Sequence, residues 1–384
     1  MSRRANGEGT VYQRSDGRYA ASAYVPTRSG RKRRTVYGRT REEAAGKLAD
    51  LLAQARRGVP LAERGWTVER YLTYWLSEVV EQERRPATIV TYRKIVERFI
   101  VPCLGRVRLD RLSPQDVRRL LNSCRKEVQR GGRRDGQPLS ARTLQMIHAV
   151  LRNAIEHAVR EELVPRNVVK LVKVPVPEYE VGTGLTVAQA RHVLGLVAED
   201  RLRAVYVLAL MLGLRKGELL GLRWVDVDIE GAELHVRQAS QRVAGELHFA
   251  APKTRRSRRS LPLPPLVVDA LKEHRDRQAA ECAVGGKAWK ESGLVFTTAH
   301  GTPIEPRNLN RHWYGVRQRA GLPGVRLHDL RHTCVTLLLD DKVPPHIVQA
   351  IAGHSGIEVT MTIYAHAARE EQRQALVGLA ERLG

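Results

Sequence analysis

One stretch of the sequence limits the possible folds more than any other: the longest apolar run, from Ala204 to Leu214. A helix needs about 20 apolar residues to cross a bilayer, so this run is too short to span one and predicts a helix buried in a protein core. Arg215 follows directly, flanked by glycines. Its planar guanidinium suits two phosphate oxygens at once. The alternative is that Arg215 only caps the buried helix and pairs with Glu218.

The charge of the chain points to a polyanionic partner. Across 384 residues, 65 Lys and Arg face 41 Asp and Glu, which leaves a formal net charge of +24. Nucleic acid is the favoured partner and a membrane surface the weaker one, because neither an anchor nor the apolar stretch of a signal peptide is visible. The four cysteines are scattered without a CxxC pair, which favours a reduced cytoplasmic compartment over a disulfide framework or a zinc ribbon.

The first sixty residues predict a small basic domain, with 14 Lys and Arg against 5 Asp and Glu. Strands are expected at 9–12, 18–25 and 33–37. A helix should begin at Thr40, with Glu43 in the reciprocal position of a capping box. The third strand overlaps a basic run that is either part of a solvated loop or, in a compact basic sheet, a DNA-reading surface: Arg31, Lys32, Arg33 and Arg34.

An all-helical domain is expected from residue 63 to residue 171, as a module of four or five helices. One helix opens at Pro86, and another at Ser113-Pro114, an N-cap followed by proline at the first helical position. A polar, basic stretch at 125–137 should loop out before a helix over 140–162. Residues 172–184 are rich in proline and glycine, which predicts an extended linker.

A third and larger domain is expected from residue 185 to residue 384. Helices are predicted at 186–198 and 202–212, and a hairpin about Gly245 is predicted to join 234–239 to 246–250. A further strand at 260–263 precedes helices that resume after Pro306. The predicted fold class is multidomain α+β: a small three-stranded β-sheet plus one helix at the N-terminus, an all-α middle domain, and a mainly α domain with a small antiparallel sheet.

The segment Leu-His-Asp-Leu-Arg-His-Thr offers a second basic group. If it is helical, His328 shares a face with Arg331, and His332 lies four residues on, which is the spacing of two zinc ligands in metalloproteases. However, the acid Asp329 directly follows the first histidine, its carboxylate is one methylene short, and Arg331 would place a cation beside the metal. A zinc site is therefore disfavoured.

Two further segments complete a chemical set. His354 follows a glycine that ends a helix, and Tyr364 stands ten residues later. Either residue alone is a weak signal, because most buried His and Tyr are ordinary core residues. A phosphodiester gains negative charge on its non-bridging oxygens in the transition state, and arginines and imidazoles stabilise that charge without a metal. A tyrosine phenol can attack the phosphorus, leaving a covalent phosphotyrosine that conserves the bond energy.

The order Arg…Lys…His-x-x-Arg…Gly-His…Tyr resembles the tyrosine recombinase family, in particular the integrases of phages and mobile elements. The most specific segments are GLRKGEL, LHDLRHT, AGHSGIEVTMTIYAH and PKTRRSRRSLPLP. The resemblance covers essentially the whole chain. It implies an arm-site DNA-binding domain at 1–62, a helical core-site DNA-binding domain at 63–171, a linker at 172–184, and a catalytic domain at 185–384.

The resemblance also implies a catalytic role for each member of the set. Arg215 and Arg331 would clamp the scissile phosphate, and His354 would form a hydrogen bond with it. His328 would act as a general acid and base near the nucleophile. Tyr364 would be that nucleophile.

The remaining basic residues include one more implied catalyst. Lys253 would be the general acid that protonates the 5′ leaving oxygen, and Glu218 would be a supporting acid that orients neighbouring basic groups. His332 and His366 match no catalytic position. Lys253 has an alternative role as one of several phosphate-contacting cations, in the cluster Lys253, Arg255, Arg256, Arg258 and Arg259.

The partners implied by the resemblance are double-stranded DNA attachment sites of core and arm types, with no metal or nucleotide cofactor. In the family, a C-terminal tail packs on a neighbouring subunit, which implies a homotetramer on two duplexes; packing on its own domain is the alternative. The resemblance also implies a recombination directionality factor (excisionase) and a host DNA-bending protein as partners. It places the enzyme in the bacterial cytoplasm, at the nucleoid. The tail would form a short amphipathic helix through Leu376, Val377, Leu379 and Ala380.

The predicted function is therefore site-specific recombination. The enzyme would integrate and excise a phage or mobile element through a 3′-phosphotyrosine intermediate and a Holliday junction. A topoisomerase would use the same chemistry, but the arm-like domain argues against it, because relaxation of DNA needs no distal site. A DNA-binding regulator without catalysis is the third hypothesis, since phosphate contacts alone supply affinity, and the intact residue set argues against it.

Overall fold

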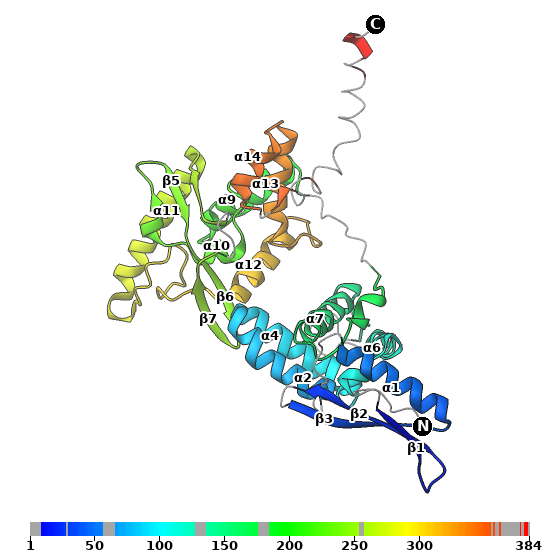
Figure 1. The fold of residues 1–384 in the computed structure, drawn as a ribbon. Helices are drawn as coiled ribbons and strands as arrows, with labels where there is room; N and C mark the ends of the chain where they lie inside the picture. The colour runs from blue at the N-terminus through cyan, green and yellow to red at the C-terminus, as the bar shows by residue number, and fades with distance from the viewer. Residues whose placement is uncertain are drawn as a thin grey trace. The chain divides into compact units, whose positions relative to one another are not determined.

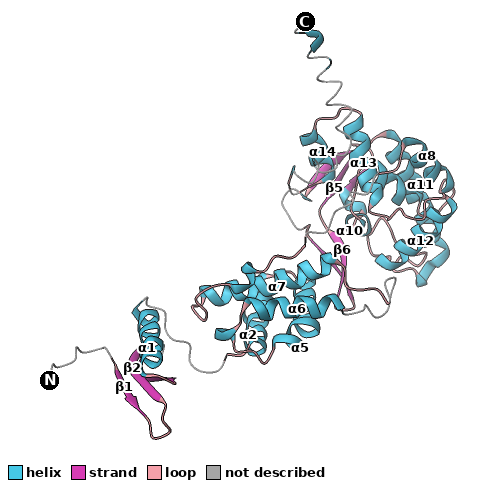
Figure 2. Ribbon diagram, turned by 90° about the vertical axis from the view of Figure 1, so that its right-hand side faces the viewer, coloured by secondary structure: helices cyan, strands magenta, loops and turns pink. Residues whose placement is uncertain are grey.

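The computed structural model describes residues 9–27, 30–56, 66–126, 136–175, 184–252, 257–354, 356, 357, 361, 377 and 380–382. The chain divides into two compact units, residues 1–178 and 179–384 (Figure 1, Figure 2). Among the described helices, none combines the length and the apolar character that crossing a bilayer requires. Helices and small antiparallel sheets make up both units, so the predicted multidomain α+β character is confirmed.

The first unit begins with an antiparallel sheet in the order β1-β2-β3, followed by helix α1. The helix packs on one face of the sheet, where Ala44 and Leu48 meet the small residues Ala21 and Ala23 (Figure 2). Small side chains on the strand let the helix approach closely. The elements are β1 (Thr10–Gln13), β2 (Tyr19–Thr27), β3 (Gly30–Gly38) and α1 (Arg41–Arg56).

The basic run at residues 31–34 lies within β3, so the predicted strand start at residue 33 is wrong. Pairing with β2 continues back to the Thr27–Gly30 pair, which extends the strand through the whole run. The helix start was predicted more closely. Thr40 Oγ1 accepts from the Glu43 N–H at 3.2 Å, but the Glu43 carboxylate accepts from the N–H of Arg39, one residue earlier than in a capping box.

The helical part of the first unit has its own core, in which one side of α7 is completely buried. Two of its helices pass through π-helical turns, so each runs continuously over three short segments. The predicted helix starts at Pro86, Pro114 and Ser140 are confirmed. The segments are α2 (Val68–Tyr74), η1 (Trp75–Val80), α3 (Glu81–Glu83), α4 (Pro86–Ile95), η2 (Val96–Ile100), α5 (Val101–Leu104), η3 (Leu109–Arg111), α6 (Pro114–Lys126), α7 (Ala141–Arg160) and η4 (Val168–Leu171).

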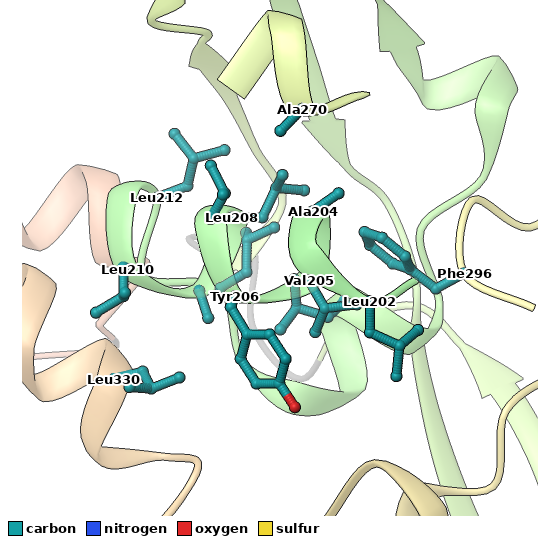
Figure 3. Packing of buried hydrophobic residues seen from close by; sticks show 14 of the residues in the cluster. Leu202, Ala204, Val205, Tyr206, Leu208, Leu210, Leu212, Ala270, Phe296 and Leu330 are labelled. Atoms are coloured by element: carbon teal, nitrogen blue, oxygen red, sulfur yellow. The ribbon is translucent and has the colours of Figure 1, made fainter. Parts of the chain in front are cut away.

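The second unit is built around α9, the helix of the long apolar run. Residues 204–210 of this helix are all buried, and Leu330 from α13 packs beneath it (Figure 3). The prediction that this run forms a helix buried in a protein core is thus confirmed. The elements are α8 (Val187–Leu196), α9 (Arg203–Met211), α10 (Lys216–Leu220), η5 (Trp224–Asp226), β4 (Val227–Asp228), β5 (Glu233–Val236), β6 (Ala239–Val243), β7 (Glu246–Ala250), β8 (Arg259–Pro262), α11 (Pro265–Gly285), η7 (Gly286–Ala288), α12 (Pro306–Arg319), α13 (Asp329–Asp340) and α14 (Pro345–Ala352).

The predicted hairpin is wrong in one of its two strands. β7 pairs with β6, whereas residues 233–236 form β5, which pairs with β4 and β8 in a separate sheet. The turn explains the difference. Ala244 and Gly245 both have positive φ, at 49° and 92°, which gives a two-residue turn that pairs Val243 with Glu246. The strand before this turn must therefore be the one that ends at Val243.

Candidate active site

Arg215 is the N-cap residue of α10, immediately after the turn at Gly213 that ends the buried helix. Its Nη1 donates to Oε1 of Glu218 at 2.7 Å, and its backbone N–H donates to Oε2 at 3.0 Å. Its Nη2 donates to the carbonyl of Gly353 at 2.6 Å. The pairing with Glu218 that the sequence left open is confirmed, and the second contact directs the guanidinium toward the segment that contains His354.

The Glu218 carboxylate is buried between two guanidinium groups. Arg259 of β8 donates from Nη2 to Oε2 at 3.1 Å, opposite the contact from Arg215. Burial by itself would raise the pKa of Glu218, but the charge of Arg259 and its hydrogen bond, followed by the charge of Arg215, lower it below its usual value. Glu218 is therefore ionised at neutral pH, and it orients two cations rather than donating a proton.

Arg331 lies in α13, directly after the core residue Leu330, and its side chain is only 2% exposed. Its Nη1 donates to the carbonyl of Gly213 at 2.5 Å. Its Nη2 is buried and has no hydrogen-bond partner among the residues that the structure describes. Burial, then the nearby charge of Arg215, lowers the pKa of Arg331 to about 9, so the group stays protonated at neutral pH. A buried cation with a free donor is a site for an anion.

His328 and His332 lie together at the start of α13. His328 is the N-cap residue, and the two rings meet edge to face with centroids 5.0 Å apart. Partial removal from water, then the charges of His332 and Arg331, lowers the pKa of His328 to about 4, so its ring is neutral at neutral pH. Asp329 is held by Arg326 through hydrogen bonds of 2.7 to 3.1 Å. Within the described residues, no group of three or more His, Cys, Asp and Glu is arranged to hold a metal.

His354 follows the C-terminal turn of α14. Gly353 ends the helix in the left-handed conformation, with φ 65°. The His354 side chain is 6% exposed, and burial, followed by the charges of Arg331 and Arg215, lowers its pKa to about 3. A neutral imidazole beside two guanidinium groups can donate an N–H to a phosphate oxygen without adding a charge that must be neutralised.

The structure thus brings together four of the six predicted catalytic residues, namely Arg215, His328, Arg331 and His354. Lys253 and Tyr364, together with Arg255, Arg256 and His366, lie outside the described residues. Within the described part, the site combines two arginines and two neutral imidazoles around a buried free donor. Such a set can bind a tetrahedral anion and stabilise additional negative charge on it.

The sequence interpretation left Arg259 among a cluster of phosphate-contacting cations. In the structure its side chain is instead directed inward, because it is 7% exposed and bonded to Glu218. A signal for this was available. Residues 259, 261 and 263 follow the two-residue period of a strand, and Leu261 and Leu263 are buried. An arginine in register with two core leucines is expected to point inward.

Comparisons with known proteins agree with this chemistry. The model of the phage integrase family matches residues 185–371, and the model of the phage integrase N-terminal SAM-like domain matches residues 67–124. The chain is 31% identical over 363 residues to a tyrosine recombinase XerC-like protein of Caldanaerobacter subterraneus subsp. tengcongensis, which covers 90% of both chains. The chain belongs to the phage integrase family. Its members are tyrosine recombinases, so this chain cleaves and rejoins DNA in site-specific recombination.

Other members of the family resemble it over similar lengths. An integrase of Streptomyces ambofaciens is 33% identical over 341 residues, which are 85% of this chain and 83% of the relative. In fold, the integrase resembles the Tn1549 transposon integrase in complex with a circular intermediate DNA, with a TM-score of 0.68 and 21% identity over 83% of this chain and 100% of that chain. It also resembles a lambda integrase tetramer bound to a Holliday junction, with a TM-score of 0.54 and 18% identity over 94% of this chain and 96% of that chain.

Proposed function

We propose that strand cleavage proceeds by attack of the Tyr364 phenol on the scissile phosphorus. The bond between the phenol oxygen and phosphorus forms while the bond to the 5′ oxygen breaks, and the 3′ phosphate stays on the enzyme. His328 accepts the phenol proton, and Lys253 donates a proton to the leaving 5′ oxygen. Rejoining is the reverse reaction with a different 5′ hydroxyl. Bond energy is conserved throughout, so the cycle needs no nucleotide.

The observation that carries this proposal is the free donor of Arg331. This guanidinium is 2% exposed, and its buried Nη2 forms no hydrogen bond with any described residue, so it can bind an anion. Arg215 and His354 lie near it: the charge of Arg215 lowers the pKa of Arg331, and the charge of Arg331 lowers the pKa of His354. The phosphate of a DNA backbone supplies two non-bridging oxygens for such a site, and their charge grows in the transition state.

The pKa values support the roles given to the histidines. With a pKa near 4, His328 is a neutral base when the phenol approaches at neutral pH. With a pKa near 3, His354 is a neutral hydrogen-bond donor. Glu218 supports the site indirectly: its ionised carboxylate accepts hydrogen bonds from Arg215 and Arg259.

We assign the DNA-binding functions to the domains as follows: arm sites to residues 1–62 and core sites to residues 63–171, with 172–184 as the linker and 185–384 as the catalytic domain. The helical domain has a groove of about 920 Å³ along α4 and α7. Basic side chains line this groove, which suits a DNA backbone. They are Arg142, Arg152, Lys170 and Lys173.

In the N-terminal sheet, the face away from α1 is the candidate reading surface. The register places Arg33 beside Tyr24 on that face, and Arg31 follows the same two-residue period. Tyr24 is 68% exposed. Arg34 is opposite Ala23, whose side chain packs against α1, so it belongs to the covered face. We therefore assign direct DNA contacts to Arg31 and Arg33 before Arg34.

The same proposal includes the assembly and its setting. The integrase would act as a homotetramer on two DNA duplexes, with an excisionase controlling direction and a host protein bending the DNA. It would do so at the nucleoid of a bacterial cytoplasm. The likeness in fold to a lambda integrase tetramer bound to a Holliday junction supports the tetramer, and the net charge of +24 supports binding to DNA.

A nicked suicide substrate tests the nucleophile. The substrate is a duplex from the end of the element, with its core site first located by footprinting, and cleavage releases a short fragment so that the covalent complex accumulates. The unchanged integrase should form the complex. Tyr364→Phe should bind the duplex with unchanged affinity and form none. A covalent complex with Tyr364→Phe would overturn the assignment.

A second test separates recombination from topoisomerase activity. The integrase is incubated with supercoiled plasmid that lacks an attachment site, and relaxation is followed on an agarose gel. Site-specific recombination predicts little relaxation, because cleavage requires the bound core site. Efficient relaxation of this plasmid would favour a topoisomerase.

A further inference from the structure

Arg259 connects three parts of the catalytic unit. Its Nε donates to the carbonyl of Ile351 at 2.7 Å, near the end of α14. Its Nη1 donates to the carbonyl of Ser257 at 3.2 Å, and its Nη2 donates to Oε2 of Glu218 at 3.1 Å. All three nitrogens therefore donate within the protein, and the side chain is 7% exposed. A guanidinium held in this way is not placed to contact a phosphate.

The first consequence of these bonds concerns Arg215. Glu218 accepts from Arg259 on Oε2 and from the Arg215 side chain on Oε1, so the two guanidinium groups fix the carboxylate from both sides. Without Arg259, the buried carboxylate would keep only one cationic partner and could rotate toward it. The position of Arg215 at the phosphate would then change, although Arg215 itself is intact.

The second consequence concerns the turn before His354. A Cβ added to Gly353 would lie 2.7 Å from Nη1 of Arg259, so the guanidinium packs directly on the backbone of this turn. The carbonyl of Gly353 accepts from Nη2 of Arg215 at 2.6 Å, and His354 is the next residue. Arg259 thus supports the turn that places both the acceptor of Arg215 and the His354 ring.

We propose that Arg259 is a positioning residue for strand cleavage, which holds Glu218 and the Gly353 turn and thereby sets Arg215 and His354 at the scissile phosphate. It does not itself touch DNA. This inference rests on the proposed roles of Arg215 and His354 and adds a residue behind them. Its loss should slow the chemical step and leave DNA binding unchanged.

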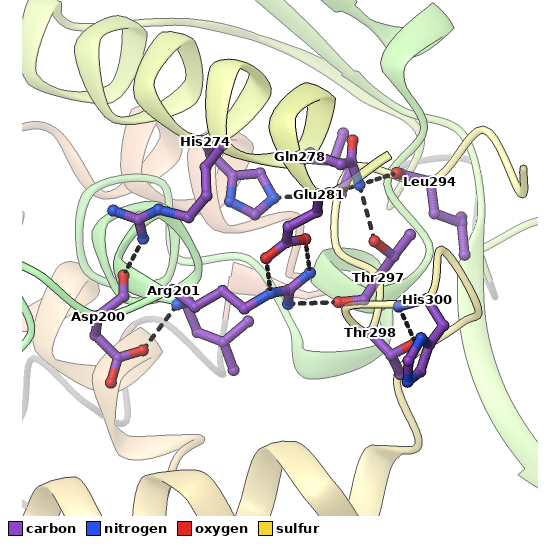
Figure 4. Close-up of polar contacts among 12 residues, drawn as sticks. Asp200, Arg201, His274, Gln278, Glu281, Leu294, Thr297, Thr298 and His300 are labelled. Carbon is purple, nitrogen blue, oxygen red and sulfur yellow. Dashed lines mark hydrogen bonds and ion pairs between the residues drawn. The ribbon is translucent and has the colours of Figure 1, made fainter. Parts of the chain in front are cut away.

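Arg201 is a matched control in the same unit. Its Nε and Nη2 donate to the two oxygens of Glu281 at 2.5 and 2.6 Å, and its Nη1 donates to the carbonyl of Thr297 at 2.7 Å (Figure 4). Like Arg259, it joins separate segments through one carboxylate and a main-chain carbonyl. None of these partners belongs to the site, so its removal should lower stability without affecting cleavage.

The experiment compares Arg259→Met and Arg259→Lys with Arg201→Met in the full chain. Affinity for the core-site duplex is measured by gel shift, and the rate of covalent complex formation is measured on the suicide substrate. Arg259→Met should bind within about 3-fold of the unchanged integrase and cleave roughly 100-fold more slowly, the size of effect expected when a reacting group is displaced by about 1 Å. Arg259→Lys keeps the charge but not the planar guanidinium, so its cleavage rate should lie between those of Arg259→Met and the unchanged integrase.

A second substrate distinguishes positioning from general damage. A methylphosphonate at the scissile position replaces one charged non-bridging oxygen with a methyl group, so cleavage depends less on the arginines. The defect of Arg259→Met should shrink to below about 10-fold on this substrate, because less charge needs stabilisation. A merely unstable protein would be slowed equally on both substrates, and Arg201→Met should show no rate defect on either.

Equal rates for Arg259→Met and Arg201→Met, or the same defect on both substrates, would overturn the role of Arg259. If circular dichroism shows Arg259→Met to be unfolded, the same comparison with Arg259→Lys decides. Tyr364→Phe is run in parallel on the same duplex. A covalent complex with that variant would overturn the proposed nucleophile and would leave the comparison of the arginine variants in force.

Discussion

Replacing Arg331 with methionine should make the unbound integrase more stable while abolishing strand cleavage. Burial and the charge of Arg215 hold the pKa of this guanidinium near 9, well below its ordinary value. One pKa unit corresponds to about 1.4 kcal/mol, so the charged group costs the folded state about 5 kcal/mol. Methionine removes that cost and fills much of the same volume.

The gain is smaller than this cost because one hydrogen bond is lost. The carbonyl of Gly213 accepts from Nη1 of Arg331 at 2.5 Å, and leaving a buried carbonyl without a donor costs about 1–3 kcal/mol. Arg331→Met should therefore raise the free energy of unfolding of the catalytic unit by roughly 2–4 kcal/mol, in the direction seen when buried charges are replaced by apolar groups.

Urea unfolding with and without sulfate measures both the stability of the protein and the binding of an anion at Arg331. Sulfate is a tetrahedral anion that can occupy the phosphate position, so it should stabilise the unchanged integrase by more than chloride at the same ionic strength. Arg331→Met should lose this specific gain and keep only the general effect of the salt. A less stable Arg331→Met protein, or an equal response of the two proteins to sulfate, would refute the view that Nη2 is an empty anion site.

Three further predictions concern Gly353, His354 and the N-terminal sheet. Gly353→Ala should lower the free energy of unfolding by at least 1–2 kcal/mol in thermal unfolding, because φ is 65° and the new methyl would press on Arg259, and it should slow covalent complex formation. The folded-state pKa of His354, about 3, is below its ordinary 6.5, so stability should fall as the pH drops from 6.5 toward 3, by about 2 kcal/mol at pH 5. A His354→Gln protein should show a flatter dependence of its unfolding free energy on pH in urea unfolding. An unchanged dependence would contradict the view that His354 is buried in its neutral form. Arg33→Ala should weaken binding to an arm-site duplex and reduce the salt slope by about 1, whereas Arg34→Ala on the covered face should do so less, as measured by fluorescence anisotropy.

Local signals in the sequence predicted much of the fold. The helix starts at Ser140 and Thr186 follow from side-chain caps whose partners lie three positions along the chain, and the start at Pro86 follows from proline at the beginning of the helix. The buried helix α9 follows from its composition alone. The hairpin was misassigned because β5 pairs with β8, about 25 residues later, and no pattern inside β5 names that partner.

The site shows the same division between near and distant contacts. The pair of Arg215 and Glu218 is three residues apart and was visible in the sequence. Two other contacts join segments more than a hundred residues apart: Arg331 donates to the carbonyl of Gly213, and Arg215 donates to the carbonyl of Gly353. Arg331 is thus oriented by the glycine turn that precedes Arg215, and Arg215 is oriented by the glycine turn that precedes His354.

These two contacts explain why glycine occupies positions 213 and 353. Both have positive φ, at 59° and 65°, a conformation that turns the chain sharply after a helix. Each turn presents the glycine carbonyl to an arginine from a distant segment of the chain. Any side chain at either position would strain the turn and shift the acceptor, so both glycines help to place the two arginines of the proposed phosphate clamp. The residues that the sequence marks as catalytic therefore depend on neighbours that only the closed fold brings to them.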